Sequence, residues 1–301
     1  MNAVSTHSPL DKIRHYLSLI KFSHTVFALP FAIIGFVLAI TSEHPPFNVG
    51  AGFVKVLLCM VFARSAAMAF NRYLDRRFDA LNPRTAVREI PAGVIKPAHA
   101  LAFTIANCVL FVITTWFINP ACFYLSFVAL FVVLFYSYTK RFTALCHIVL
   151  GIGLSLSPIG AYLSVTGQFD LLPVMFSVMV LTWVSGFDII YALQDEAFDR
   201  SQDLHSIPAA LGTKNALNVS TLLHIVSGAV VIAAGVYGQA HFNWVYWIGA
   251  AFYIGALVYQ HSLVKPNDLS KVGIAFANTN GIASVVFAVF TLAAIYIKYL
   301  G

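Results

Sequence analysis

The apolar run "AGFVKVLLCMVFARSAAMAF", residues 51–70, leads directly into the charged stretch "NRYLDRRFDALNPRTAVREIPAG", residues 71–93. A helix needs roughly 20 apolar residues to cross a bilayer, and the run is about that long. The stretch behind it holds acidic residues and arginines, and such groups beside hydrocarbon are costly unless they are paired, hydrated or bound to a ligand. The junction therefore predicts a membrane-spanning helix whose polar end binds a ligand.

The composition of the whole chain agrees with a membrane location. Its 301 residues are 59% hydrophobic and 10% charged, whereas a soluble domain carries roughly 25% charged residues. We predict an all-α fold, a polytopic bundle of nine transmembrane helices surrounded by membrane lipid. The nine apolar runs lie near residues 23–42, 52–74, 98–118, 120–139, 145–166, 171–194, 216–238, 243–262 and 273–298.

The beginning of the chain differs from the rest. Residues 1–22 are polar and mildly amphipathic, and they lack the compact apolar core and cleavage site of a signal peptide. We expect a cytoplasmic or interfacial segment that leads into the first span. The whole of residues 1–301 is then expected to form a single membrane-embedded domain.

The basic residues indicate the orientation of the bundle. With nine spans, 15 of the 18 Lys and Arg residues fall on the side of the N-terminus. Such an asymmetry follows the positive-inside rule and predicts that this side faces the cytoplasm, in a bacterial inner membrane. The net charge of +6 is then a topology signal, and it gives no reason to expect a nucleic-acid partner.

The acidic residues are concentrated in two places. Eight of the 12 lie after the second apolar run or at the end of the sixth. Aligning the two places pairs Asn71, Asp75 and Asp79 with Tyr191, Asp195 and Asp199. One helix-plus-loop unit thus occurs twice, and internal repeats of membrane proteins often bracket the site between them. We predict two four-helix repeats around a central cavity plus one further helix. The two acidic spans, near 52–74 and 171–194, are expected to be neighbours, with their carboxylates facing the shared cavity.

Each acidic motif predicts a metal ligand. Side chains four residues apart share a helix face, so each motif presents two carboxylates together. Mg²⁺ commonly binds through one or two carboxylates plus substrate phosphates. One such motif alone is more often a solvated, ion-paired helix end, but two matched motifs on one side of the membrane favour a Mg²⁺-bridged diphosphate. The basic side chains expected to hold the remaining phosphate charge are Arg84, Arg88, Lys140, Arg141 and Lys214.

At these residues the chain resembles the UbiA superfamily of intramembrane aromatic prenyltransferases. The resemblance rests on N-x-x-x-D-x-x-x-D at 71–79, D-x-x-x-D at 195–199 and "YSYTKR" at 136–141, and it covers essentially the whole chain. It implies two Mg²⁺ ions, held by Asn71, Asp75, Asp79, Asp195 and Asp199. It also implies catalytic roles for the four aspartates, Tyr191 and Lys140.

The resemblance further implies a reaction. A polyprenyl diphosphate ionises at the metal site, and an electron-rich aromatic carbon attacks the allylic cation. The stretches "KFSHTVFALPFA" at 21–32 and "NPRTAVREIPAG" at 82–93 are most similar to the 4-hydroxybenzoate polyprenyltransferase-like branch, which implies an aromatic acid acceptor and a place in ubiquinone or menaquinone biosynthesis. Two other acceptors stay open: a naphthoate of the futalosine route to menaquinone, and haem as in haem O synthases.

Five further polar residues are candidates for substrate binding. Arg64 precedes Asn71 by seven residues on nearly the same helix face, and we expect it either to pair with Asp188 or to sit at a hydrated helix contact. Tyr136 shares a face with Lys140 and either lines the site or packs. The remaining candidates, Lys21 and His24, open the first span. Lys21 resembles a basic position of the family near the diphosphate. His24 is a candidate contact of the aromatic acceptor, although a structural hydrogen bond is the more common role of such a histidine.

Two further expectations concern the loop and the class of protein. We expect residues 79–96 to order over the site when a diphosphate supplies the missing counter-charge to Arg84 and Arg88. A membrane transporter is the main non-enzyme alternative. Its ionisable residues are expected near the membrane midplane at broken helices, whereas here they gather on one side.

Overall fold

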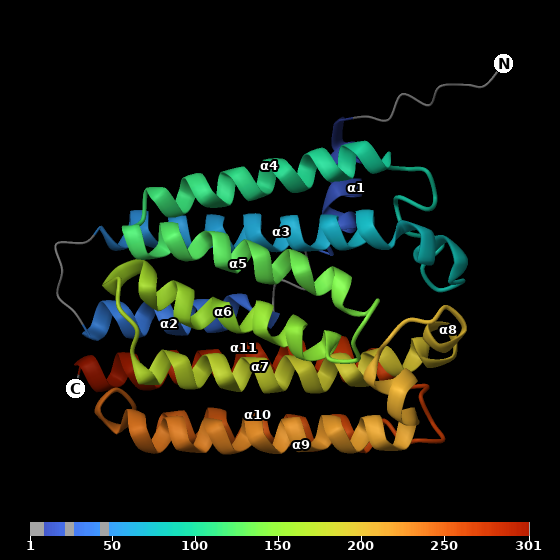
Figure 1. The fold of residues 1–301 in the computed structure, drawn as a ribbon. Coiled ribbons are helices and arrows are strands. Elements are labelled where there is room, and N and C mark those ends of the chain that lie inside the picture. The colour runs from blue at the N-terminus through green and yellow to red at the C-terminus, as the bar shows by residue number, and fades with distance from the viewer. Residues whose placement is uncertain (1–8, 22–26, 43–47, 301) are drawn as a thin grey trace.

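The computed structural model describes residues 9–21, 27–42 and 48–300, and every regular element in these ranges is a helix. The long helices run alongside one another in an elongated bundle, with the end of α11 at one end and the short helix α8 at the other (Figure 1). The main helices are α1 (Pro9–Leu19), α2 (Leu29–Ser42), α3 (Val49–Leu81), α4 (Pro97–Trp116), α5 (Pro120–Thr139), α6 (Cys146–Thr166), α7 (Leu171–Ala192), α8 (Glu196–Ser201), α9 (Ile207–Tyr237), α10 (Val245–Leu263) and α11 (Asn280–Leu300). The expected all-α fold is confirmed for the described residues.

Seven segments of the described residues are long and apolar enough to cross a membrane, as in an integral, multi-pass membrane protein. Each of the nine expected ranges overlaps a helix. However, α2 is an apolar helix of only 14 residues, and α10 is not among the seven. α10 contains polar or amphipathic side chains such as Tyr246, Trp247 and Gln260, which lower its hydropathy.

Short polar sequences fix where the long helices begin. The expected "NP" turn is present: Pro120 opens α5, and the Asn119 side chain accepts a hydrogen bond from the backbone N–H of Cys122 at 2.8 Å. Asn48 caps α3 and Asp170 caps α7 in the same way. Each cap satisfies a backbone N–H that the helix itself leaves without a partner.

Glycines bring the central helices close together. A Cβ atom added to Gly35 on α2 would lie 2.1 Å from the backbone oxygen of Pro158 on α6. A Cβ on Gly151 of α6 would lie 2.6 Å from the backbone oxygen of Leu181 on α7. Because lipid chains are as apolar as leucine, such close backbone contacts rather than hydrophobicity drive helix association in a membrane.

A row of polar side chains joins α9 to α7. Ser220 and Ser227 donate hydrogen bonds to the backbone oxygens of Gly186 and Met179, at 2.7 and 3.0 Å. His224 lies between them, with Nε2 at 3.1 Å from the backbone oxygen of Trp183. All three side chains are buried, so the contacts hold α9 in register along α7.

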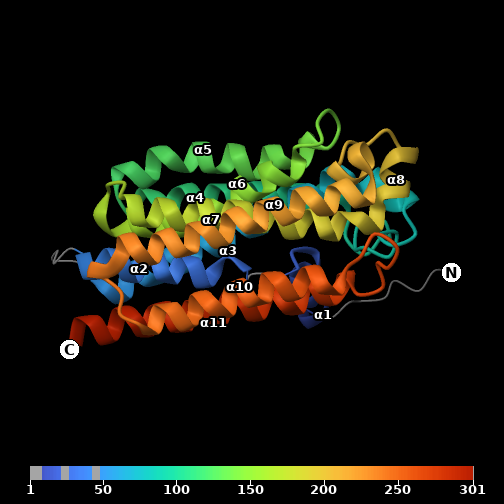
Figure 2. The ribbon, with the colours of Figure 1, turned by 90° about the horizontal axis from the view of Figure 1, so that it is seen from below.

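The segments that follow α3, α5 and α7 meet at one end of the bundle, the end that also carries α8 (Figures 1 and 2). We call this the polar end. The helices α3 and α7 themselves do not pack along their length, because α2 and α6 lie between them. The expectation that the two acidic helices are direct neighbours was therefore wrong, and only their polar ends come together.

Candidate active site at the polar end of the bundle

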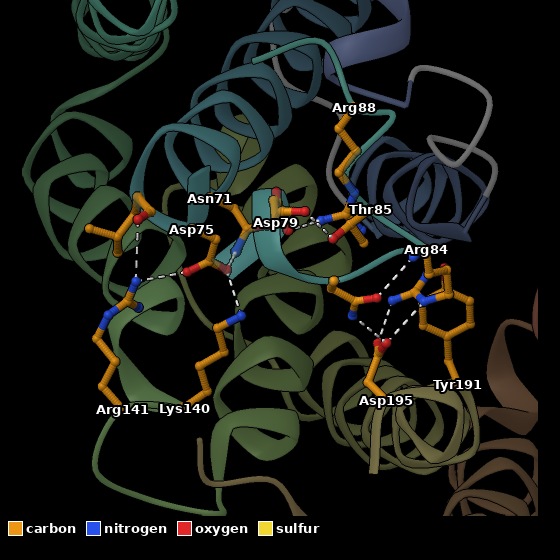
Figure 3. Close-up of polar contacts among 12 residues, drawn as sticks. Asn71, Asp75, Asp79, Arg84, Thr85, Arg88, Lys140, Arg141, Tyr191 and Asp195 are labelled. Atoms are coloured by element: carbon orange, nitrogen blue, oxygen red, sulfur yellow. Dashed lines mark hydrogen bonds and ion pairs between the residues drawn. The ribbon is translucent and has the colours of Figure 1, made fainter. Parts of the chain in front are cut away.

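Asp75 lies on α3 with 2% of its surface exposed and is surrounded by donors. Asn71, one turn earlier, donates to Asp75 Oδ2 at 3.1 Å. Lys140 Nζ lies 2.8 Å from the same oxygen, and Arg141 Nη2 lies 2.8 Å from Oδ1 (Figure 3). The end of α5 thus brings two cations to one buried carboxylate.

Asp79, one turn further along α3, is paired with the loop that follows the helix. Arg88 Nη1 lies 2.7 Å from Asp79 Oδ1, and the hydroxyl of Thr85 donates to the backbone oxygen of Asp79 at 3.0 Å. The second carboxylate oxygen, Oδ2, is buried and has no hydrogen-bond partner among the described residues. A buried carboxylate oxygen without a donor favours binding of a cation.

Asp195 connects the second acidic motif to the same loop. Asn82 donates to Asp195 Oδ1 at 3.0 Å, and Arg84 donates to both oxygens of Asp195 and to the hydroxyl of Tyr191, the last at 2.9 Å (Figure 3). Burial lowers the pKa of the Arg84 guanidinium, but the hydrogen bond to Asp195 and the nearby Tyr191 raise this pKa above its usual value. Arg84 therefore stays charged.

Three of the four motif aspartates are thus each held by cations from another segment of the chain. This changes one expectation about the loop: Arg84 and Arg88 have their counter-charge within the protein, in Asp195 and Asp79. An anionic ligand at this site has to draw these cations away from carboxylates. Asp199 lies within electrostatic range of Asp195 and Lys140 and completes the acidic group.

The second motif differs from the first in backbone conformation. α7 ends at Ala192, a 3₁₀ turn covers Leu193–Asp195, and Asp199 lies on the separate helix α8. The expectation that Asp195 and Asp199 share one helical stripe was therefore wrong. No Pro or Gly marks the break in the sequence, so helical spacing alone was a misleading guide there.

Asp188 pairs with a residue that the sequence did not single out. His147 Nδ1 lies 2.7 Å from Asp188 Oδ2, and His147 Nε2 accepts from the backbone N–H of Ile207 at 3.3 Å. Since Nε2 accepts, Nδ1 carries the proton and donates to the carboxylate. Of the two roles expected for Arg64, the pairing with Asp188 was wrong. Among the described residues, Arg64 donates a hydrogen bond to the backbone oxygen of Lys21 at 3.5 Å.

An apolar cavity of ≈ 300 Å³ lies deeper in the bundle, between α3, α4, α5 and α6. Arg64 and Tyr136 line it, together with apolar residues and the thiols of Cys59 and Cys122. Arg64 Nε is buried and has no hydrogen-bond partner among the described residues. The cavity therefore combines a long apolar wall with one cationic group.

Two other expected substrate-binding residues, Lys21 and Lys214, have exposed side chains and form no ion pair among the described residues. The side chain of Lys21 is exposed, and Lys21 adopts a left-handed backbone conformation with φ 46°. Lys214 is exposed near the start of α9. His24 lies outside the described residues. Conversely, sequence reasoning did not identify Asn82 or His147, because a lone Asn in a loop and a lone His in an apolar run carry no distinguishing pattern.

The donor set suits a hard divalent cation, although the described residues form no complete metal site by themselves. Among the described residues, no three His, Cys, Asp or Glu side chains are gathered as in an all-protein metal site. Mg²⁺ rarely needs one, because it commonly binds through one or two carboxylates, water and substrate phosphates. The free oxygen of Asp79 and the ion-paired carboxylates of Asp75 and Asp195 fit this mode of binding.

Comparison with known proteins defines the family. Residues 28–282 match the model of the UbiA prenyltransferase family. The chain belongs to this family. It is therefore a prenyltransferase, and the resemblance seen in the sequence motifs is confirmed.

Known enzymes and solved structures are similar to this protein over most of the chain. A 4-hydroxybenzoate octaprenyltransferase of Nitrosospira multiformis is 30% identical over 77% of this chain and 79% of its own, and one of Tolumonas auensis is 28% identical over 81% and 86%. A UbiA homologue of Aeropyrum pernix superposes with a TM-score of 0.77, at 28% identity over 92% of this chain and 98% of its own. A UbiA homologue of Archaeoglobus fulgidus, bound to DMAPP and Mg²⁺, has a TM-score of 0.73 at 20% identity. The match covers 94% of this chain and 99% of that homologue, and it shows the shared fold.

Proposed function

We propose that this UbiA family member transfers a polyprenyl group from polyprenyl diphosphate to an aromatic acid of the 4-hydroxybenzoate type, with Mg²⁺, in quinone biosynthesis. The observation that carries the proposal is the polar end itself, where paired carboxylates and cations lie at the head of an apolar cavity. The relatives named 4-hydroxybenzoate octaprenyltransferase support the choice of acceptor.

Mg²⁺, in our proposal two ions, would be held by Asp75, Asp79, Asp195 and Asp199, with Asn71 orienting Asp75. The metal supplies charge neutralisation to the leaving diphosphate. As the diphosphate binds, cations that now pair with the carboxylates turn to the phosphate oxygens. These are Arg84, Arg88, Lys140 and Arg141.

The apolar cavity is our proposed site for the prenyl tail. Its lining is almost entirely apolar, so an allylic cation formed at its polar head is shielded from water. The C–O bond breaks with its electron pair going to the diphosphate. The aromatic carbon then forms the new C–C bond, and the ring proton leaves.

The acceptor is proposed to lie between the diphosphate and the tail cavity. Arg64, a guanidinium with an unpartnered Nε that lines the cavity, would bind the carboxylate of the aromatic acid. Tyr136 lines the same cavity as Arg64 and lies within electrostatic range of Arg64 and of Asp188. Asp188, oriented by the hydrogen bond from His147, is the proposed acceptor of the ring proton.

We further propose a single membrane domain over residues 1–301, in which nine helices cross the membrane as two four-helix repeats plus one. The overlap of every expected span with a helix supports this count. The distribution of Lys and Arg supports a cytoplasmic polar end in a bacterial inner membrane. The exposed basic side chains Lys21 and Lys214 would then lie on the cytoplasmic side, where they can steer the diphosphate.

The test uses the purified protein in lipid vesicles. Prenyl diphosphates of several lengths are offered with 4-hydroxybenzoate, with 1,4-dihydroxy-6-naphthoate or with haem, in Mg²⁺ and in EDTA. We expect Mg²⁺-dependent prenylation of 4-hydroxybenzoate. Prenylation of the naphthoate or haem alone would overturn the acceptor, and the absence of any transfer with all three would overturn the proposed function.

A further inference from the structure

Arg72 is a buried cation for which the described residues provide no hydrogen bond or ion pair. It lies on α3, directly after Asn71, with 5% of its surface exposed. Its Nε is buried without a hydrogen-bond partner, and none of the ion pairs among the described residues includes it. Burying an unpaired charge is costly, so this arrangement is unfavourable until an anion binds.

The acidic groups near Arg72 are each contacted by another side chain, although Asp79 Oδ2 has no hydrogen-bond partner among the described residues. Electrostatically, Arg72 is attracted by Asp79 and Glu89 and repelled by Arg88. Asp79 Oδ1, however, is held by Arg88 at 2.7 Å, and Glu89 accepts a hydrogen bond from Ser18. Arg72 therefore differs from the four cations paired with the motif aspartates, which must leave a carboxylate before they can bind an anion; these are Arg84, Arg88, Lys140 and Arg141.

The position of Arg72 on α3 shows which anion it can reach. Arg72 precedes Asp75 by three residues and Asp79 by seven, so the three lie along one face of α3, about 4.5 and 10.5 Å apart in axial rise. Arg72 lies on the side of the carboxylates that is nearer to the tail cavity, whose lining includes Met68, one turn earlier. An anion that is bound at the carboxylates and whose apolar chain lies in the cavity would therefore lie beside Arg72.

We propose that Arg72 is a preset phosphate-binding residue, which holds the phosphate group that carries the prenyl chain. This rests on the proposed function. The planar guanidinium donates two parallel hydrogen bonds to phosphate oxygens. When the C–O bond breaks, its electron pair stays on an oxygen of this phosphate, and Arg72 stabilises the charge that develops there.

The proposal predicts that removing the charge of Arg72 leaves the stability of the protein equal or higher but weakens ligand binding. If Arg72 had a structural role, the same change would lower the stability. In the ligand-free protein, Arg72→Gln removes an unpaired buried charge, so the unfolding temperature should stay equal or rise. The affinity for inorganic pyrophosphate with Mg²⁺, measured by calorimetry in detergent, should fall at least about tenfold in Arg72→Gln. Arg72→Lys should retain more of the affinity than Arg72→Gln, and Arg77→Gln, at an exposed arginine on the same helix, should bind as the wild type does.

The outcomes that overturn the proposal are distinct. A clear fall in the unfolding temperature of ligand-free Arg72→Gln would make Arg72 a structural residue. Unchanged affinity for pyrophosphate would show that Arg72 does not bind the phosphate. A rise in KM for the aromatic acid alone would show the same. If the wild-type protein transfers a prenyl group and only the Arg72 result fails, the proposed function stands without this inference.

Discussion

Arg84 donates hydrogen bonds to both carboxylate oxygens of Asp195, although 111 residues separate them in the chain. Their side chains are 31% and 18% exposed. Ion pairs this close to solvent contribute at most about 1 kcal/mol to stability. The ion pair of Arg84 with Asp195 joins the two acidic motifs. Because it is weak, Arg84 can exchange the carboxylate for a phosphate of a ligand, as the proposed function requires.

Asp195→Asn should lower turnover at least about 100-fold and leave the protein folded. A metal ligand acts through its charge, and Asn keeps nearly the same shape. The matched control is Asp203→Asn, at an exposed acid of the same segment whose left-handed backbone (φ 52°) an Asn tolerates. Prenyl transfer in vesicles at limiting Mg²⁺ measures the effect. Equal turnover in both variants would remove Asp195 from the metal site.

Arg84→Gln should raise the KM for prenyl diphosphate about tenfold or more, because a charge-assisted phosphate contact is lost. The KM for the aromatic acid should change little, and the unfolding free energy should fall by less than about 1 kcal/mol, as the exposure of the pair implies. Lys96→Gln, at an exposed cation of the same loop, serves as the comparison. A large loss of stability with unchanged KM would show that Arg84 only fastens the loop to Asp195.

Cys59 and Cys122 line the apolar cavity, and Cys108 and Cys146 do not. A long-chain prenyl diphosphate with Mg²⁺ should therefore slow alkylation of the first two thiols by an apolar maleimide and leave the other two unchanged. Pyrophosphate with Mg²⁺ fills the polar end alone and should not protect them. Mass spectrometry of single-cysteine variants gives the rate at each site. Equal rates with and without the prenyl diphosphate would place the tail outside this cavity.

The sequence was sufficient for the broad features of the molecule. Long apolar runs determine helices in a bilayer, since every backbone group has to be satisfied within the segment. Pairs such as "NP" at 119–120 mark turns by local backbone chemistry. Recognition of the two aspartate motifs rested on their repetition, and it led to the correct family.

The partners of the aspartates could not be read from the sequence. His147 contacts Asp188 across 41 residues, and Asn82 contacts Asp195 across 113. Such contacts depend on how the helices pack, and nothing in the local pattern encodes them. The 3₁₀ turn at Leu193–Asp195 was missed as well, because no Pro or Gly marks the break in the sequence.

The position of α2 against α6 depends on a residue without a side chain, and this gives a last prediction. Gly35→Ala would place a Cβ 2.1 Å from the backbone oxygen of Pro158 and 2.8 Å from its carbonyl carbon. Backbone atoms cannot turn aside as a flexible side chain does, so the two helices would have to separate. We expect the unfolding free energy to fall by about 1–3 kcal/mol, the usual cost of overpacking.

The control is Gly255→Ala on α10, where a Cβ meets nothing within 4 Å. It should be neutral or slightly stabilising because Ala favours the helix. Thermal unfolding in detergent compares the two variants. Because Pro158 adjoins residues of α6 that line the cavity, Gly35→Ala should also lower the affinity for long prenyl diphosphates more than for pyrophosphate. Equal stability of both variants would mean that α2 does not approach α6 this closely.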